Sequence, residues 1–153
     1  MKKDLGKGVP MRLKQISVFL ENRPGILAAL TTLLGEHGIN IRALSIAESR
    51  DFGVIRMIVP DPAAAAALLY KKGYSIQVVE VLAVEVADEP GGLGRALRQL
   101  AEEHLNVDYL YTFMNKLAEN AVIVLRVDNL DYACTVLSKG GFKLLSQEDF
   151  NRL

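Results

Sequence analysis

The amino-acid sequence contains the same pattern twice, and this internal repeat limits the fold more than any other feature. The turn Asn-Arg-Pro-Gly at residues 22–25 returns 66 residues later as Asp-Glu-Pro-Gly at residues 88–91, and Leu27 returns at the same offset as Leu93. Past the middle of each copy the offset becomes 68, which a two-residue insertion near residues 115–119 explains. A repeat of this length predicts two copies of one small domain, so any site in one copy has a counterpart to test in the other.

The expected domains follow from the limits of the two copies. Half of the 153 residues are apolar, so each copy can bury a core of its own. We expect a flexible N-terminal tail at residues 1–12, a first domain at 13–80 and a second domain at 81–153. No Gly-rich, Pro-rich or polar linker separates the copies between Val79 and Val84. The last strand of the first copy is therefore expected to run almost directly into the first strand of the second.

Periodicity predicts the same element order in both copies. In the first copy, apolar residues alternate with others before Asn22, as in a strand, and then recur at helical spacing until Gly38. The remaining elements expected in the first copy are strands at 40–48 and 53–59, a helix from Asp61 to Gly73 and a strand at 75–81. Those expected in the second copy are a strand at 82–87, a helix at 91–104, two strands meeting near 115–119, a helix at 130–139 and a strand at 142–146.

This order predicts an α+β fold. Strand, helix, strand, strand, helix, strand is the ferredoxin-like βαββαβ unit, an antiparallel sheet with both helices on one face. Such a sheet leaves its other face and its edge strands uncovered, and pairing with a second domain or chain covers them. We therefore expect two ferredoxin-like domains and a homodimer.

Composition argues against nucleic acid and membrane partners. Eighteen basic residues balance eighteen acidic ones, so the chain has no net positive charge that would attract a polyanion. Tyr109, Tyr111 and Phe113 could stack on bases, but without a basic surplus beside them packing at an interface or on a sheet face is favoured. The longest apolar run, 63–69, is too short to span a bilayer, and the N-terminus has no signal-peptide core. We expect a cytoplasmic protein.

The sequence offers little support for catalysis or for a cofactor. Neither His37 nor His104 has a histidine at the matching position of the other copy or a second zinc ligand at i+3 or i+4. The single cysteine, Cys134, excludes an internal disulfide, fits a reducing compartment and is expected to be buried and inert. Residues 91–94 lack the Lys-Ser/Thr of a phosphate-binding loop, and no nucleophile turn appears. We expect no enzymatic activity, no metal and no cofactor.

The repeated turn is the candidate binding feature. A Pro-Gly pair between a strand and a helix brings the backbone close to whatever lies at the helix N-terminus, where free N–H groups favour a carboxylate. The alternative is that Asn22 and Asp88 only cap their helices. Asn40 and Asn106 open the second strand of each copy and are expected next to the turn, where an amide could bind both a carboxylate and an ammonium. Their alternative is a structural role in a loop.

The same residues resemble a known family. Residues 20–27, Leu-Glu-Asn-Arg-Pro-Gly-Ile-Leu, followed by Gly-Ile-Asn-Ile at 38–41, resemble the ACT domain, a small amino-acid-binding regulatory module attached to many metabolic enzymes. Residues 88–93 and 105–107 resemble the same pattern in the second copy. The resemblance covers about residues 13–148 and leaves no catalytic domain. It therefore implies a stand-alone tandem protein more than an ACT-bearing enzyme.

The resemblance also suggests how a ligand would be held. In the serine-sensing ACT domain of phosphoglycerate dehydrogenase, a histidine, the turn asparagine and the asparagine opening the second strand bind the ligand. These roles correspond to Leu20, Asn22 and Asn40, and the missing histidine implies a more apolar ligand than serine. The corresponding positions of the second copy are Val86, Asp88 and Asn106. An acidic Asp88 would oppose a carboxylate and favour an ammonium, so the two sites are expected to be unequal.

We therefore predict a regulatory module that binds an amino acid and is read by a metabolic enzyme or regulator. One alternative is a regulatory subunit of a larger biosynthetic enzyme, such as the small subunit of acetolactate synthase, which resembles residues 16–47. Another is an interaction module whose ligand site has decayed. The predicted ligand-binding residues are Asn22, Arg23, Pro24, Gly25, Ile26, Leu27, Asn40, Ile41, Asp88, Gly91, Gly92, Leu93 and Asn106.

Overall fold

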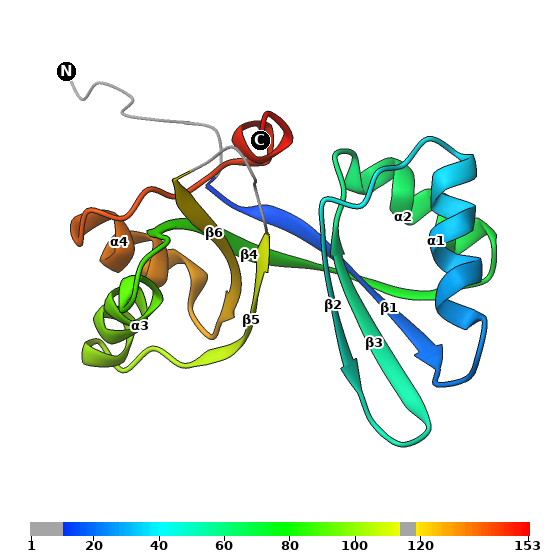
Figure 1. The fold of residues 1–153 in the computed structure, drawn as a ribbon, viewed down its shortest axis with the longest axis horizontal. Helices are drawn as coiled ribbons and strands as arrows, with labels where there is room; N and C mark the ends of the chain where they lie inside the picture. The colour runs from blue at the N-terminus through cyan, green and yellow to red at the C-terminus, as the bar shows by residue number, and fades with distance from the viewer. Residues whose placement is uncertain (1–10, 114–118) are drawn as a thin grey trace. The chain divides into compact units, whose positions relative to one another are not determined.

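The computed structural model describes residues 11–113 and 119–153, which form six strands and five helices (Figure 1). The elements are β1 (Leu13–Glu21), α1 (Ile26–Glu36), β2 (Ala43–Glu48), β3 (Phe52–Ile58), α2 (Pro62–Lys71), β4 (Ser75–Ala87), α3 (Gly92–Glu102), β5 (Val107–Phe113), β6 (Asn120–Val127), α4 (Leu130–Lys139) and α5 (Gln147–Asn151). Most of the expected tail and most of the segment near 115–119 lie outside the described residues. The chain divides into two compact units, Lys14–Glu80 and Val81–Leu153, and the latter includes the described residues before Lys14.

The unit Lys14–Glu80 has the predicted ferredoxin-like topology. Its strands lie in the order β2-β3-β1-β4, with β1 and β2 both antiparallel to β3. Helices α1 and α2 cover one face of this sheet, where Leu30 and Leu69 pack with Ile16, Val18 and Met57 in a fully buried core. Every second residue of β1 and β3 reaches this core because side chains alternate across a strand.

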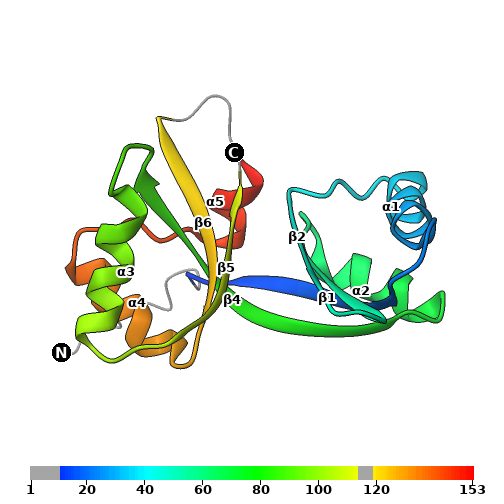
Figure 2. The same ribbon diagram turned by 60° about the horizontal axis from the view of Figure 1, so that its bottom comes forward.

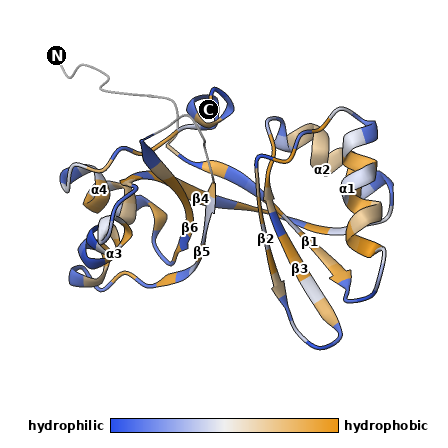
Figure 3. Cartoon of the chain, viewed as in Figure 1, coloured by the Kyte–Doolittle hydropathy of each residue, from blue (hydrophilic) through white to orange (hydrophobic). Residues whose placement is uncertain are grey.

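The second unit repeats the arrangement with strands in the order β4-β6-β5. Helices α3 and α4 lie side by side against this sheet (Figures 1 and 2) and bury a core that includes Leu100, Leu137, Val84 and Leu125. Helix α3, the first helix of the second copy, is more hydrophilic than α1, the first helix of the first copy. Figure 3 shows blue residues in α3, whereas α1 is mostly orange and white. Both halves of the chain therefore have the α+β fold that the repeat predicts.

Strand β4 serves both copies. Two consecutive strands were expected at 75–81 and 82–87, and the structure instead has one unbroken strand, Ser75–Ala87. The absence of a linker is confirmed, and the reason is local: the residues at the junction are Val79, Glu80, Val81 and Leu82, which contain no turn former. The boundary between the two compact units falls inside this strand.

The expected last strand, 142–146, is reduced to a single bridge between Val84 and Leu144. Two backbone hydrogen bonds flank it, from Glu85 N–H to the Lys143 carbonyl and from Leu145 N–H to the Ala83 carbonyl, both 2.9 Å. The strand ends because Ser146 and Asp149 form a capping box that turns the chain into α5. The sequence analysis missed this helix, although the Ser-x-x-Asp spacing is a helix-start signal.

Helix α5 lies on the opposite side of strands β4 to β6 from α3 and α4 (Figure 2). Its Phe150 is fully buried, and the Phe150 ring lies 5.1 Å from the ring of Phe113 on β5, measured between centroids. Tyr111, on the same side of β5 as Phe113, is also buried. In this unit the second sheet face is thus partly covered by the chain's own last helix, which was not among the elements expected from the sequence.

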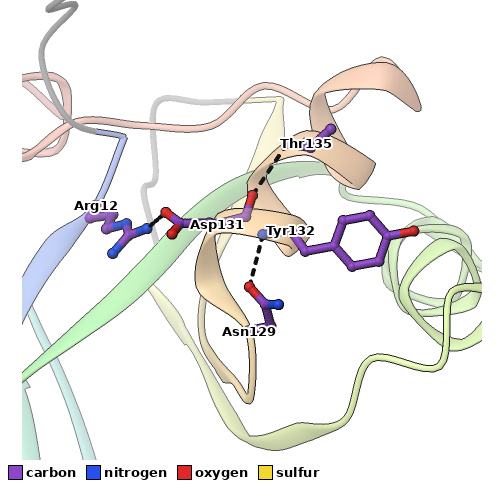
Figure 4. Close-up of polar contacts among 5 residues, drawn as sticks. All are labelled: Arg12, Asn129, Asp131, Tyr132 and Thr135. Carbon is purple, nitrogen blue, oxygen red and sulfur yellow. Dashed lines mark hydrogen bonds and ion pairs between the residues drawn. The ribbon is translucent and has the colours of Figure 1, made fainter.

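Side chains define the N-terminus of α4 (Figure 4). The Asn129 side chain accepts a hydrogen bond of 3.1 Å from the Tyr132 N–H and so caps the helix. The guanidinium of Arg12 pairs with the carboxylate of Asp131 in the first turn, and the Thr135 hydroxyl donates to the Asp131 carbonyl. Helix α4 therefore begins at the residue predicted from the sequence, and the ion pair links it to the segment before β1.

Candidate functional site

A left-handed glycine ends each repeated turn. Gly25 has φ 85° and Gly91 has φ 84°, a conformation that only glycine adopts without strain. These glycines are themselves the N-caps of α1 and α3, and neither helix has a side-chain cap. The alternative role of Asn22 and Asp88 as helix caps is therefore wrong.

The first turn of α1 has backbone donors available to a ligand. The Ile26 N–H donates to the Arg23 carbonyl at 3.4 Å, and the Ala29 N–H donates to the Gly25 carbonyl at 2.9 Å. Between them, the N–H groups of Leu27 and Ala28 donate to no acceptor in residues 11–113 and 119–153. Such donors, together with the positive end of the helix dipole, favour an anion.

A cleft of about 160 Å³ adjoins this turn in the unit Lys14–Glu80. It combines aliphatic side chains with charged ones and an asparagine. Its lining residues are Leu20, Glu21, Asn22, Arg23, Ile26, Leu27, Ile46, Glu48, Gly53 and Ile55. Four predicted site residues, Asn22, Arg23, Ile26 and Leu27, thus share one cleft, whereas Pro24 and Gly25 shape the turn beside it.

Strand register explains why a cleft lies there. Leu20 of β1 and Glu48 of β2 both pair with Gly53 of β3, so all three face the same side of the sheet. This is the side that Ile55 and the first turn of α1 occupy. Gly53 has no side chain to fill the space between its neighbours, and the sequence analysis did not identify Gly53, Glu48, Ile46 or Ile55.

Charged groups lie at the rim of the cleft. The Arg23 Nε lies 3.0 Å from a carboxylate oxygen of Glu21, and both side chains are about two-thirds exposed. An exposed pair of this kind contributes little to stability. A ligand carboxylate could therefore replace Glu21 as the partner of Arg23 at little cost in free energy. Glu48, on the neighbouring strand, offers a carboxylate to a cation.

Asn40 and Ile41 do not join this cleft within one chain. The Asn22 N–H bonds to the Asp51 carbonyl at one end of the sheet, whereas the Arg42 N–H bonds to the Ile58 carbonyl at the other. Helix α1 has 11 residues and so separates these ends by about 16 Å. Because β1 and β2 are parallel to each other, the end of β2 meets the turn, and its start, near Asn40, does not. This corrects the expected position of Asn40, and Ile41 packs partly buried against the core.

The turn of the second copy is more tightly closed. A side-chain Cβ at Gly92 would lie 1.9 Å from the Ala87 carbonyl oxygen, so the strand end presses on the first helical residue. Arg95, in the first turn of α3, forms an ion pair of 2.5 Å with Glu89 of the turn. The Asp88 side chain is exposed, and Leu93 packs partly buried against the core.

Two further features separate the copies. Val86 pairs with Ala121, so a methyl group stands where the first copy has Gly53. A cleft of about 270 Å³ does border the second turn, but on the side of the chain's last segment rather than of β5. Its lining residues are Glu85, Val86, Ala87, Gly92, Arg95, Asn120, Gly141, Phe142 and Lys143.

Asn106 has a structural role in the loop after α3. Its side-chain amide donates to the Asp108 carboxylate at 3.0 Å, and its N–H donates to the Asp128 carboxylate at 3.2 Å. Like Asn40, it lies beyond the C-terminal end of the first helix of its copy, away from the turn. The structure thus does not bring Asn106 together with Asp88 or Gly91.

Other reactive side chains are dispersed. Residues 11–113 and 119–153 contain no group of three or more His, Cys, Asp or Glu arranged to hold a metal ion. The His37 ring nitrogen Nδ1 lies 2.9 Å from the Leu33 carbonyl oxygen. Burial raises the pKa of the half-buried Cys134 thiol, and the nearby Arg12 guanidinium opposes that rise. In the same described residues, no helix has the length and hydrophobicity needed to cross a membrane.

Comparison with known proteins agrees with the repeat and the fold. The family model of the ACT domain pair matches residues 11–153. A Bacteroides thetaiotaomicron protein of known crystal structure is similar, with 36% identity, a TM-score of 0.87 and coverage of 94% of this chain and 98% of that one. No curated protein gives a significant sequence match.

Two structures with lower identity share the fold. The regulatory subunit of aspartate kinase from Thermus thermophilus, in its ligand-free form, has 16% identity, a TM-score of 0.59 and coverage of 86% of this chain and 96% of that one. The regulatory subunit of aspartate kinase from Thermus flavus has 18% identity, a TM-score of 0.57 and coverage of 85% and 94%.

Proposed function

Because the chain belongs to the family of ACT domain pairs, we propose that it is a cytoplasmic regulatory protein that binds a free amino acid in the cleft beside the first turn of α1. The observation that carries the proposal is that unpaired N–H groups in the first turn of α1 adjoin a small cleft lined by apolar and charged side chains. The family match covers residues 11–153, so ligand binding is the activity to test first.

Each part of an amino acid has a complementary group in the cleft. The carboxylate would accept hydrogen bonds from the N–H groups of Leu27 and Ala28 and lie near the Arg23 guanidinium. The ammonium would lie toward the Glu48 carboxylate, and the Asn22 amide could bind either group. The ligand side chain would then rest on the apolar floor.

The second turn, with Asp88, Gly91, Gly92 and Leu93, would bind the same ligand more weakly or not at all. Its helix start is pressed against Ala87, and Ala121 places a methyl group where the first copy has Gly53. We keep the homodimer in the proposal, because ligand binding can regulate a partner only if it favours one arrangement of domains or chains over another.

A screen of the twenty amino acids by thermal shift, followed by isothermal titration, tests the proposal. At least one should raise the Tm at millimolar concentration, because a ligand that binds only the native state stabilises it. The matching amino-acid amide, which lacks the carboxylate, is the control and should not stabilise. If no amino acid raises the Tm or releases heat on titration, amino-acid binding is refuted.

A second candidate function is that of a regulatory subunit of a larger biosynthetic enzyme, such as acetolactate synthase. The observation that favours such a role is the fold shared with two structures described as regulatory subunits of aspartate kinase. Co-purification of a stoichiometric catalytic chain with the protein from its native cells, identified by mass spectrometry, would support it. A protein that elutes only as its own oligomer would argue for the stand-alone regulator.

A further inference from the structure

We infer that the ligand of the cleft is an amino acid with a short aliphatic side chain, which packs over Gly53. This inference rests on the proposed function, because it names the class of ligand for the same cleft. It makes Gly53 the residue that determines whether a copy of the repeat can accept such a ligand.

The chemistry of the lining selects an apolar side chain. Five of the side chains that line the cleft are aliphatic, one is the uncharged polar Asn22, and the others are charged. The five are Leu20, Ile26, Leu27, Ile46 and Ile55. A ligand hydroxyl or amide on this floor would lose its water without gaining a partner. An apolar ligand gains instead, by about fourfold in affinity for each methylene it buries.

The size of the cleft favours a short side chain. Its volume of about 160 Å³ is well below that of a pocket for a larger organic ligand, which starts at about 300 Å³. The open space lies above Gly53, where an added Cβ would meet one atom, the Ala47 carbonyl oxygen at 4.0 Å. A branched aliphatic group would take the place that a residue side chain leaves empty.

Charges orient the ligand over this floor. Glu48 pairs with Gly53 across the strands and points to the same face, so an ammonium near Glu48 puts the ligand's Cα above the edge of the glycine. Arg23 and the helix N–H groups lie on the turn side and suit the carboxylate. With the ammonium and the carboxylate in these positions, the ligand side chain points toward Leu20 and Ile55.

The second copy supports the role of Gly53 by contrast. Its equivalent position is Ala121, paired with Val86 as Gly53 is paired with Leu20. The residue equivalent to Ile26 is Gly92. The second copy therefore has an added methyl group at Ala121 and lacks the aliphatic side chain that Ile26 contributes to the cleft. One chain therefore contains both the position with glycine, Gly53, and the same position with alanine, Ala121.

The experiment is isothermal titration of the full chain with valine, leucine, isoleucine, serine, aspartate and phenylalanine, for the wild type and Gly53→Ala. We expect at least one aliphatic amino acid to bind at least tenfold more tightly than serine, aspartate and phenylalanine. Gly53→Ala should weaken that binding at least tenfold without lowering the Tm of the free protein, since alanine suits a strand better than glycine. Gly35→Ala, in α1 with no atom within 4 Å of the added Cβ, is the matched control and should bind as the wild type does.

The outcomes separate the inference from the proposed function. Preference for serine, aspartate or phenylalanine, or unchanged aliphatic binding in a folded Gly53→Ala, would overturn the inference while amino-acid binding stands. No binding of any of the twenty amino acids to the wild type would overturn both. The wild-type series decides the ligand class even if the variant unfolds.

Discussion

At the scale of single residues, four glycines at or near the two turns are glycines for different physical reasons. Gly25 and Gly91 are required by a left-handed backbone. Gly92 is required by the carbonyl oxygen of Ala87, and Gly53 by no contact in the protein itself. A glycine that the fold does not require, in a cleft, is a reason to look for a ligand.

Gly92→Ala should lower the free energy of unfolding by about 1–3 kcal/mol, because its Cβ would overlap a backbone atom that no rotamer can move away. Gly94→Ala, two residues further along α3, meets no atom within 4 Å, and should raise the free energy of unfolding by about 0.5–1 kcal/mol. Urea denaturation of the two variants checks both. Equal stability of the two would show that the strand end can withdraw from the helix.

At the scale of elements, the two copies differ most at their ends. The first copy finishes as a full strand in β4, and the second finishes as one bridge followed by α5. That helix has only five residues, so its stability must come from tertiary packing and its cap, because an isolated helix of this length does not form. Phe150 and the capping box are the features that hold it.

Phe150→Ala should lower the free energy of unfolding by about 3–5 kcal/mol, since it removes a fully buried ring from its contact with Phe113. Tyr70→Ala is the control, because that ring is 79% exposed and its loss should cost little. Chemical denaturation followed by circular dichroism measures both. A small effect at Phe150 would mean that α5 is not part of the cooperative fold.

The capping box predicts a pH dependence. Hydrogen bonds from Ser146 lower the pKa of the exposed Asp149 carboxylate in the folded chain. A lowered folded pKa stabilises the fold above the unfolded value, and this contribution is lost as the pH falls through about 4 and below. The Tm difference between wild type and Asp149→Asn should therefore shrink from pH 7 to pH 3. Glu148→Gln, next in the chain but outside the box, is the control, and an unchanged Asp149 difference would exclude the capping contribution.

At the scale of the whole molecule, the repeat provides two related turns, and the described residues that line the clefts beside them differ. The first copy has Gly53 and Ile26 where the second has Ala121 and Gly92. We therefore propose the first copy as the binding domain, because Ala121 of the second copy adds a methyl group at the position of Gly53.

Titration of the full chain should give about one high-affinity ligand per chain. Asp88→Asn with Glu89→Arg would make the second turn resemble the first in charge, yet should leave the stoichiometry at one, because Ala121 and Gly92 remain. Analytical ultracentrifugation in the same buffer fixes the chain count to which the stoichiometry refers. Two equal sites per wild-type chain would contradict the unequal roles of the copies.

The sequence by itself determined the fold class, the two copies and the turn, because each depends on patterns within a few residues: alternation before Asn22, helical spacing after Gly25, and a turn repeated at a fixed offset. It also contained the Ser146–Asp149 capping-box pattern at the start of α5, a helix that was not predicted. Only the tertiary structure decided which residues share the cleft, because strand register is a long-range property. The parallel course of β1 and β2 brings Glu48 and Gly53 to the turn and takes Asn40 to the other end of the sheet.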